Sequence, residues 1–196
     1  MSKKYGISGS DYAKGVGAAG PVMTTAAALI GANLVVVALA WDNPPKVGAT
    51  GGIVTITFLM MISFVSFINV LHQLMRAEYL VSRLRLSEGV EEAKEKIVQE
   101  LDQITKWARI MHVTGLVFTM VAFWVISYKY LIGIVGYHFI ILVLPFALFV
   151  VIWIPKLTGI EKEVSGKSVE TILQLVIELI FLALLCLDFM RLIVIF

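Results

Sequence analysis

Four long runs of this sequence contain no Asp, Glu, Lys or Arg, and they constrain the fold more than any other feature. They cover residues 21–41, 51–75, 110–128 and 130–155. A helix needs roughly 20 mostly apolar residues to cross a bilayer. Each run is close to this length or longer, so the sequence predicts four membrane-spanning helices, with Lys129 in the turn between the third and the fourth.

A fifth window, residues 169–196, has the same character although it holds six polar residues in 28. The whole chain is 59% hydrophobic and 15% charged, whereas soluble domains average about 45–50% and about 25%. One core of a 196-residue chain cannot hide this excess, so lipid must cover it. We therefore predict an all-α integral membrane protein with five transmembrane helices in one domain, residues 21–196.

The positions of Lys and Arg predict the orientation. If the glycine-rich N-terminal segment, residues 1–20, is cytoplasmic, then 13 basic residues lie inside and three outside. Cytoplasmic loops of membrane proteins carry such an excess. We expect a cell-membrane protein with its N-terminus in and its C-terminus out. The end of the first run, "ALAW", resembles a signal-peptidase site, but the run is longer than the usual apolar region of about 7–15 residues.

Residues 76–109 form the one long hydrophilic block, and its apolar residues recur at steps of three and four. This spacing predicts two helices with one apolar seam each, which extend the second and third spans as an antiparallel cytoplasmic hairpin. A break is expected at residues 87–89. Either the hairpin is a solvated loop that closes on itself, or it serves as a docking surface for partner chains or as a gate lever. The seam residues are Leu74, Ala77, Val81, Leu84, Ile97, Leu101, Ile104, Ala108 and Met111.

The last span carries ionisable groups that lipid disfavours. Thr171, Gln174, Glu178 and Asp188 fall within a sector of about 100° on this helix. Intramembrane acids usually face a cavity or a partner group. Glu178 is therefore either a carboxyl packed against another helix or a cation or proton site. Asp188 and Arg191 are three residues apart, which predicts a salt bridge near the outer surface.

The second span offers a polar face of its own, because Ser63, Ser66, Asn69 and His72 recur every three residues. Such residues usually hydrogen-bond between helices. They either pack the bundle or line a polar path. On the second reading, the ion-path candidates are Glu178, Gln174, Thr171, Asp188, Asn69 and Ser66.

Two histidines raise the alternative of a haem b site. His72 and His112 each lie a few residues inside the inner end of adjacent antiparallel spans, so they are expected at one depth. Bis-histidine ligation is one way to hold haem. Hydrogen-bonded histidines at the membrane interface are the simpler interpretation, and we expect no metal site.

The features that the sequence lacks narrow the possible functions more than those that it has. It has one cysteine, a net charge of +2 that gives no sign of nucleic-acid binding, and no GxxxxGK[ST], HExxH, GxSxG or CxxC motif. Three hypotheses remain. The first is an oligomeric ion channel or ion-translocating protein with Glu178 on the path. The second is a non-catalytic subunit of a larger membrane complex, and the third is a haem-b electron-transfer subunit.

Overall fold

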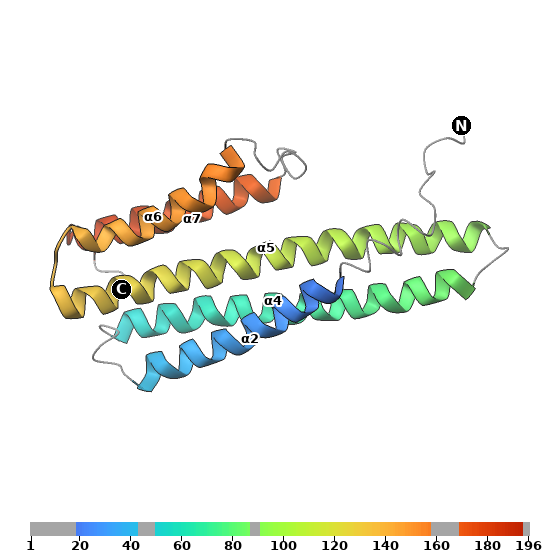
Figure 1. The fold of residues 1–196 in the computed structure, drawn as a ribbon, viewed down its shortest axis with the longest axis horizontal. Helices are drawn as coiled ribbons and strands as arrows, with labels where there is room; N and C mark the ends of the chain where they lie inside the picture. The colour runs from blue at the N-terminus through green and yellow to red at the C-terminus, as the bar shows by residue number, and fades with distance from the viewer. Residues whose placement is uncertain (1–18, 43–49, 87–90, 158–168, 194–196) are drawn as a thin grey trace. The chain divides into compact units, whose positions relative to one another are not determined.

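The computed structural model describes residues 19–42, 50–86, 91–157 and 169–193, and each regular element in these ranges is an α-helix (Figure 1). The predicted N-terminal segment lies almost entirely outside the described residues, as does the break at residues 87–89. The helices are α2 (Ala19–Asp42), α4 (Thr50–Leu86), α5 (Glu91–Val135), α6 (Ile140–Leu157) and α7 (Val169–Phe189).

Four of these helices, α2, α4, α5 and α7, are long and apolar enough to cross a membrane. The described apolar part of α6, Ile140–Ile154, is shorter than a typical span. The chain is thus all-helical in its described part, with the features of a multi-pass membrane protein. A fifth span through α6 stays a prediction.

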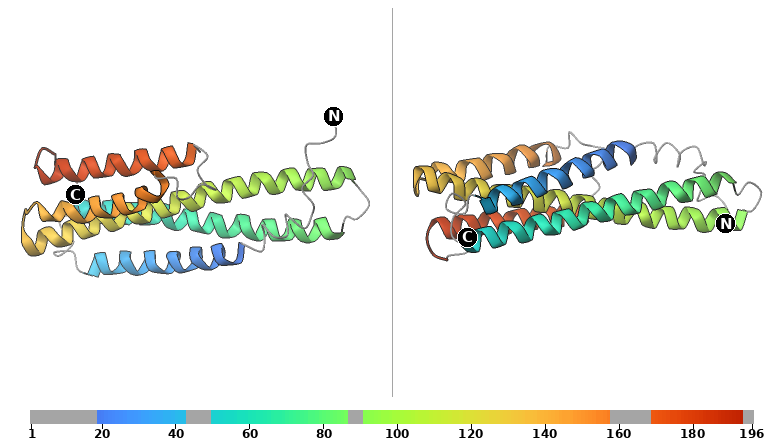
Figure 2. Two further views of the ribbon diagram at one scale, coloured as in Figure 1. Left: turned by 45° about the horizontal axis from the view of Figure 1, so that its top comes forward. Right: turned by 90° about the horizontal axis from the view of Figure 1, so that it is seen from below.

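The described residues fall into two compact units, and the first combines residues 64–112 with the start of α2. In it, the second half of α4 lies beside the first half of α5 (Figure 2). Ala77, Leu80 and Val81 of α4 form a buried cluster with Leu101 and Ile104 of α5. All but Leu80 belong to the predicted seam, since spacings of three and four bring residues to one helix face.

An ion pair between Arg76 and Glu100 borders this cluster. The side chain of Leu84 lies outside the described part, and the cytoplasmic location of the pair of helices stays a prediction.

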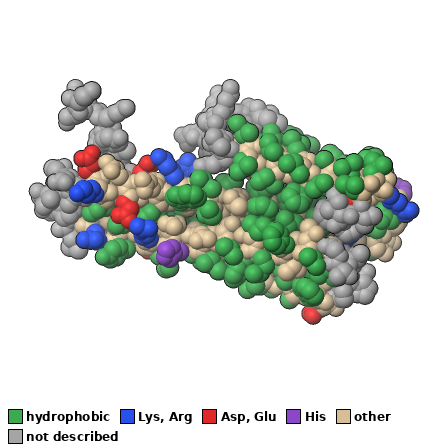
Figure 3. All heavy atoms as spheres, turned by 180° about the vertical axis from the view of Figure 1, so that it is seen from behind, with side chains coloured by type: hydrophobic (Ala, Val, Ile, Leu, Met, Phe, Trp, Pro, Cys, Tyr) green, Lys and Arg blue, Asp and Glu red, His purple; other side chains and the backbone are tan. Residues whose placement is uncertain are grey.

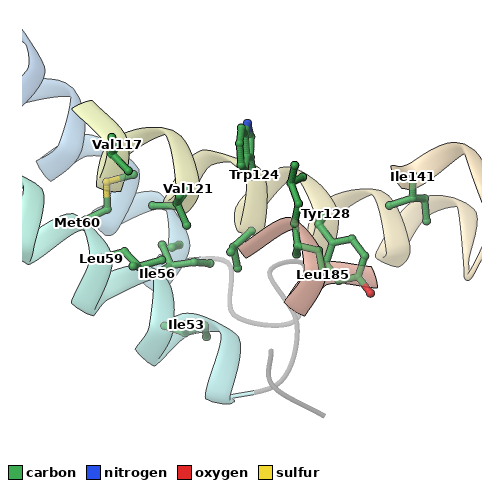
Figure 4. Close-up of a cluster of buried hydrophobic side chains, with 14 of the residues drawn as sticks. Ile53, Ile56, Leu59, Met60, Val117, Val121, Trp124, Tyr128, Ile141 and Leu185 are labelled. Atoms are coloured by element: carbon green, nitrogen blue, oxygen red, sulfur yellow. The ribbon is translucent and has the colours of Figure 1, made fainter. Parts of the chain in front are cut away.

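The second unit combines residues 32–63 with residues 113–196, and it holds the larger apolar core. Two sets of core residues are spaced three or four positions apart in the sequence (Figure 4). They are Ile53, Ile56 and Met60 of α4, and Val117, Val121, Trp124 and Tyr128 of α5. This spacing lets antiparallel helices interlock their side chains. Ile141 of α6 and Leu182 and Leu185 of α7 also belong to this core.

The turn between α5 and α6 lies seven residues beyond the predicted one. The boundary predicted at Lys129, between residues 110–128 and 130–155, is wrong because α5 continues to Val135. Gly136, the residue after the helix, has a φ of 72° and donates its N–H to the Ile132 carbonyl at 2.9 Å. This is the left-handed C-terminal cap that glycine adopts without steric strain.

Replacing Gly136 with alanine is expected to destabilise the protein by about 1–2 kcal/mol, because L-residues are strained at this φ. A Cβ there would meet no atom within 4 Å, so no clash contributes. Gly31, inside α2, has equally open surroundings. Gly31→Ala should instead be neutral or stabilise by up to about 1 kcal/mol. Unfolding in mixed detergent micelles measures both, and equal effects of the two changes would contradict the cap.

The face of the second unit that Figure 3 shows is largely apolar where its residues are described. Phe58, Phe139 and Val151 are each about two-thirds exposed or more, at 67%, 71% and 66%. A soluble monomer rarely exposes contiguous apolar patches of more than a few hundred Å². This surface fits contact with lipid acyl chains.

Candidate functional site

Helix α7 places its polar residues inward and its apolar residues outward. Glu178 and Asp188 are buried, together with Leu182 and Leu185 between them, whereas Ile172, Leu173, Leu179 and Ile180 on the other face are about half exposed. This is the reverse of a surface helix in a soluble protein. The predicted polar stripe of α7 therefore faces the interior of the second unit.

Glu178 lies near the middle of α7 and is completely buried. Its Oε2 accepts a hydrogen bond from Nε1 of Trp153 on α6. Its Oε1 accepts one from Nε2 of Gln174, one turn earlier on α7, at 2.7 Å. Each oxygen of this acid thus receives an N–H donor, and both donors are neutral side chains.

Asp188 lies ten residues further along α7, ~15 Å along the axis. It is 5% exposed, and its Oδ2 accepts a hydrogen bond from the Tyr128 hydroxyl at 2.9 Å. The Lys129 Nζ lies 3.6 Å from the same oxygen, and Lys129 is itself buried. The two charges form an ion pair away from water, in which each depends on the other.

Arg191 does not make the predicted salt bridge with Asp188. Its guanidinium lies over the ring of Tyr137, 4.3 Å from the centroid, which is a cation–π contact. Its backbone adopts a φ of 57° and donates N–H to the Asp188 carbonyl, while the N–H of Leu192 bonds to the Leu187 carbonyl. These two bonds form a Schellman motif, which ends α7 with an arginine where glycine is usual.

A second polar cluster joins α2, α4 and α5 within the same unit. Asn33 Nδ2 donates to Ser63 Oγ at 2.8 Å, and the Ser63 and Thr119 hydroxyls lie 2.6 Å apart. Both hydroxyls also approach the Gly115 carbonyl oxygen, at 2.8 and 2.9 Å. The bonds connect three helices, which is the usual role of small polar residues in membranes.

The other predicted path residues differ in their surroundings. Thr171 is half-buried at the start of α7, on the side of Gln174. Ser66 is buried, whereas Asn69 is exposed and donates to the Val65 carbonyl of its own helix at 3.0 Å. Ser66 and Asn69 belong to the first unit, whereas Glu178 belongs to the second.

The two histidines of the haem hypothesis both lie in the first unit. His112 packs edge-on against Phe67, with ring centroids 5.9 Å apart, whereas His72 is exposed. His72 is five residues along α4 from Phe67, ~7.5 Å along the axis. This offset separates His72 from the level of His112, so the geometry gives no support for proposing bis-histidine ligation.

Sequence reasoning missed three residues of the α7 site: Tyr128, Lys129 and Trp153. The two aromatic residues look like interfacial anchors in the sequence, and Lys129 looks like part of a turn. One signal was available, since a lysine near the outer end of one predicted span and an aspartate near the outer end of another are expected at similar depth. Opposite charges inside a membrane tend to pair.

Comparison with protein-family models, curated proteins and solved structures gives no match for this chain. The fold and the site together define a helical membrane protein with two buried carboxylates on one face of α7.

Proposed function

We propose that this protein is an ion-translocating membrane protein and that Glu178 is the central site on its path. The observation that carries the proposal is an acid with no exposed surface near the middle of an apolar helix. A charge at the bilayer centre is costly, about 2.5–3.5 kcal/mol on insertion scales. A packing contact alone does not require an acid, because glutamine accepts the same hydrogen bond from Trp153.

The path that we propose follows the inward face of α7. Thr171 and Gln174 precede Glu178 along this face, and Asp188 follows it. The lipid-facing side of the same helix offers no polar group between Ile172 and Ile180. Membrane helices with this pattern commonly mark routes for ions or protons.

The proposal includes the membrane context. We place the N-terminus and the α4–α5 hairpin in the cytoplasm, following the excess of basic residues there. We also propose that the protein works as a homo-oligomer, with other membrane subunits as the alternative partners.

A non-catalytic subunit of a larger complex is the second candidate. The hydrogen bonds from Trp153 and Gln174 to Glu178 favour this candidate, because they give both carboxylate oxygens a partner within the chain. Under this alternative, Glu178 fixes α7 against α6 and carries no ion.

Glu178→Gln separates the two candidates. In proteoliposomes with an imposed ion gradient, we expect this change to reduce flux by about 10-fold or more, since the charge is lost while the bond from Trp153 can be kept. Asp102→Asn is the matched control, because Asp102 is an exposed acid paired with Lys106, and it should leave flux unchanged. Wild-type flux in Glu178→Gln would favour the structural subunit.

A further inference from the structure

We propose that the translocated species is a proton, which binds Glu178, and that the Gln174 amide changes from donor to acceptor when it does. This inference rests on the proposed function and names the ion. Two features carry it: the chemistry of the groups around both carboxylates, and the position of an amide on one oxygen of Glu178.

The groups that face the two acids point N–H or O–H bonds at the carboxylate oxygens, so in this arrangement they offer no ligand oxygen to a metal cation. Glu178 is met by the N–H groups of Trp153 and Gln174, and Asp188 by the Tyr128 hydroxyl and the Lys129 ammonium. Calcium takes about 6–8 oxygen ligands, and magnesium needs a near-octahedral oxygen shell. Among the described residues, no three His, Cys, Asp or Glu side chains gather as candidate ligands.

The two acids differ in the charge of their partners. Asp188 faces the ammonium of Lys129 from α5, so its charge is balanced within the chain. Glu178 faces neutral Trp153 from α6 and neutral Gln174 from its own helix. A proton on Glu178 removes a buried charge that no cation in these contacts balances. Of the two acids, Glu178 is therefore the one whose hydrogen-bond partners carry no compensating charge.

Proton binding at Glu178 changes one hydrogen bond. When the proton forms an O–H bond at Oε1, that oxygen becomes a donor and can no longer face the Gln174 N–H group. A half-turn of the Gln174 amide presents its carbonyl oxygen, which accepts the new O–H. Trp153 is only a donor and continues to bond Oε2. When the proton leaves Oε1 for a water molecule on the proposed path, the amide turns back and presents its N–H group to that oxygen again.

In this proposal Gln174 positions the proton on Glu178, and the substitution Gln174→Met tests this role. Methionine keeps the length of the side chain but supplies no amide donor or carbonyl acceptor. In proteoliposomes we expect the wild-type protein to pass protons, reported by a pH dye inside the vesicles, and to pass neither sodium nor potassium. Gln174→Met should reduce proton flux by about tenfold or more, the effect of losing one hydrogen bond to a charged group. Gln103→Met, on the exposed side of α5, is the control.

Infrared spectra taken in acid and in alkaline buffer provide a readout that does not depend on flux. We expect a carboxylic-acid carbonyl band that is missing in Glu178→Gln and shifted in Gln174→Met, because the O–H has lost its acceptor.

An unshifted band in Gln174→Met, or unchanged proton flux, overturns the role of Gln174. Sodium or potassium flux without proton flux overturns the proton assignment and leaves the proposed function standing. If no ion passes, the proposed function fails as well.

Discussion

Lys129→Met is expected to destabilise the protein by about 3–5 kcal/mol, because it leaves Asp188 as a buried charge without its counter-ion. Both members of the pair are less than a tenth exposed, and Lys129 Nζ lies 3.6 Å from Asp188 Oδ2. Methionine retains most of the apolar length of lysine, so the loss is mainly electrostatic. The free energy of unfolding in mixed detergent micelles measures it.

A double mutant identifies the cause of this loss. Adding Asp188→Asn to Lys129→Met removes the uncompensated charge, and the Tyr128 hydroxyl can still donate to the asparagine carbonyl. We expect the double mutant to recover most of the lost stability. A double mutant as unstable as the single one would show that Lys129 stabilises the fold through contacts other than Asp188.

Lys106→Met is the matched control for this pair. Lys106 Nζ lies closer to its partner, 2.7 Å from Asp102 Oδ2, but both side chains are more than half exposed. Exposed pairs contribute about 0.2–1 kcal/mol. We therefore expect the buried Lys129–Asp188 contact to contribute more to stability than the shorter but exposed Lys106–Asp102 contact. Equal losses from Lys129→Met and Lys106→Met would contradict the burial of the Asp188 pair.

Trp124→Ala is expected to cost about 3–5 kcal/mol, the range for removing a large aromatic side chain from a core. Trp124 is 1% exposed and packs within the core of the second unit (Figure 4). Helix association in membranes depends strongly on such packing, since lipid tails are as apolar as the side chains. The same unfolding measurement applies.

Phe123→Ala is the control, because Phe123 precedes Trp124 on α5 and is 50% exposed. Lipid can replace the contacts that its ring loses, so we expect a change within about 1 kcal/mol. If Phe123→Ala destabilises the protein as much as Trp124→Ala, then Phe123 is covered by another chain and its face is an interface.

Much of the fold follows from local sequence patterns. The uncharged runs predict the apolar helices, and the steps of three and four predict that Ala77, Val81, Leu101 and Ile104 share one cluster, as found. The same periodicity puts Gln174, Glu178 and Asp188 on one face of α7. These properties depend on the helical repeat, which each segment carries by itself.

The partners of the α7 acids could not be predicted in this way. Lys129 was expected in a turn because a lone lysine between apolar runs is least costly at the surface. The structure instead continues α5 to Val135 and buries Lys129 beside Asp188. Trp153 likewise reaches Glu178 only because α6 contacts α7.

The sequence by itself determined the apolar helices, their inward and outward faces and the acidic residues among them, since hydrophobicity and helical periodicity are local. Only the tertiary structure decided that Trp153 and Gln174 bond Glu178 while Lys129 and Tyr128 hold Asp188. The physical reason is that a buried charge is tolerated only beside a partner, and most of these partners come from helices far away along the chain.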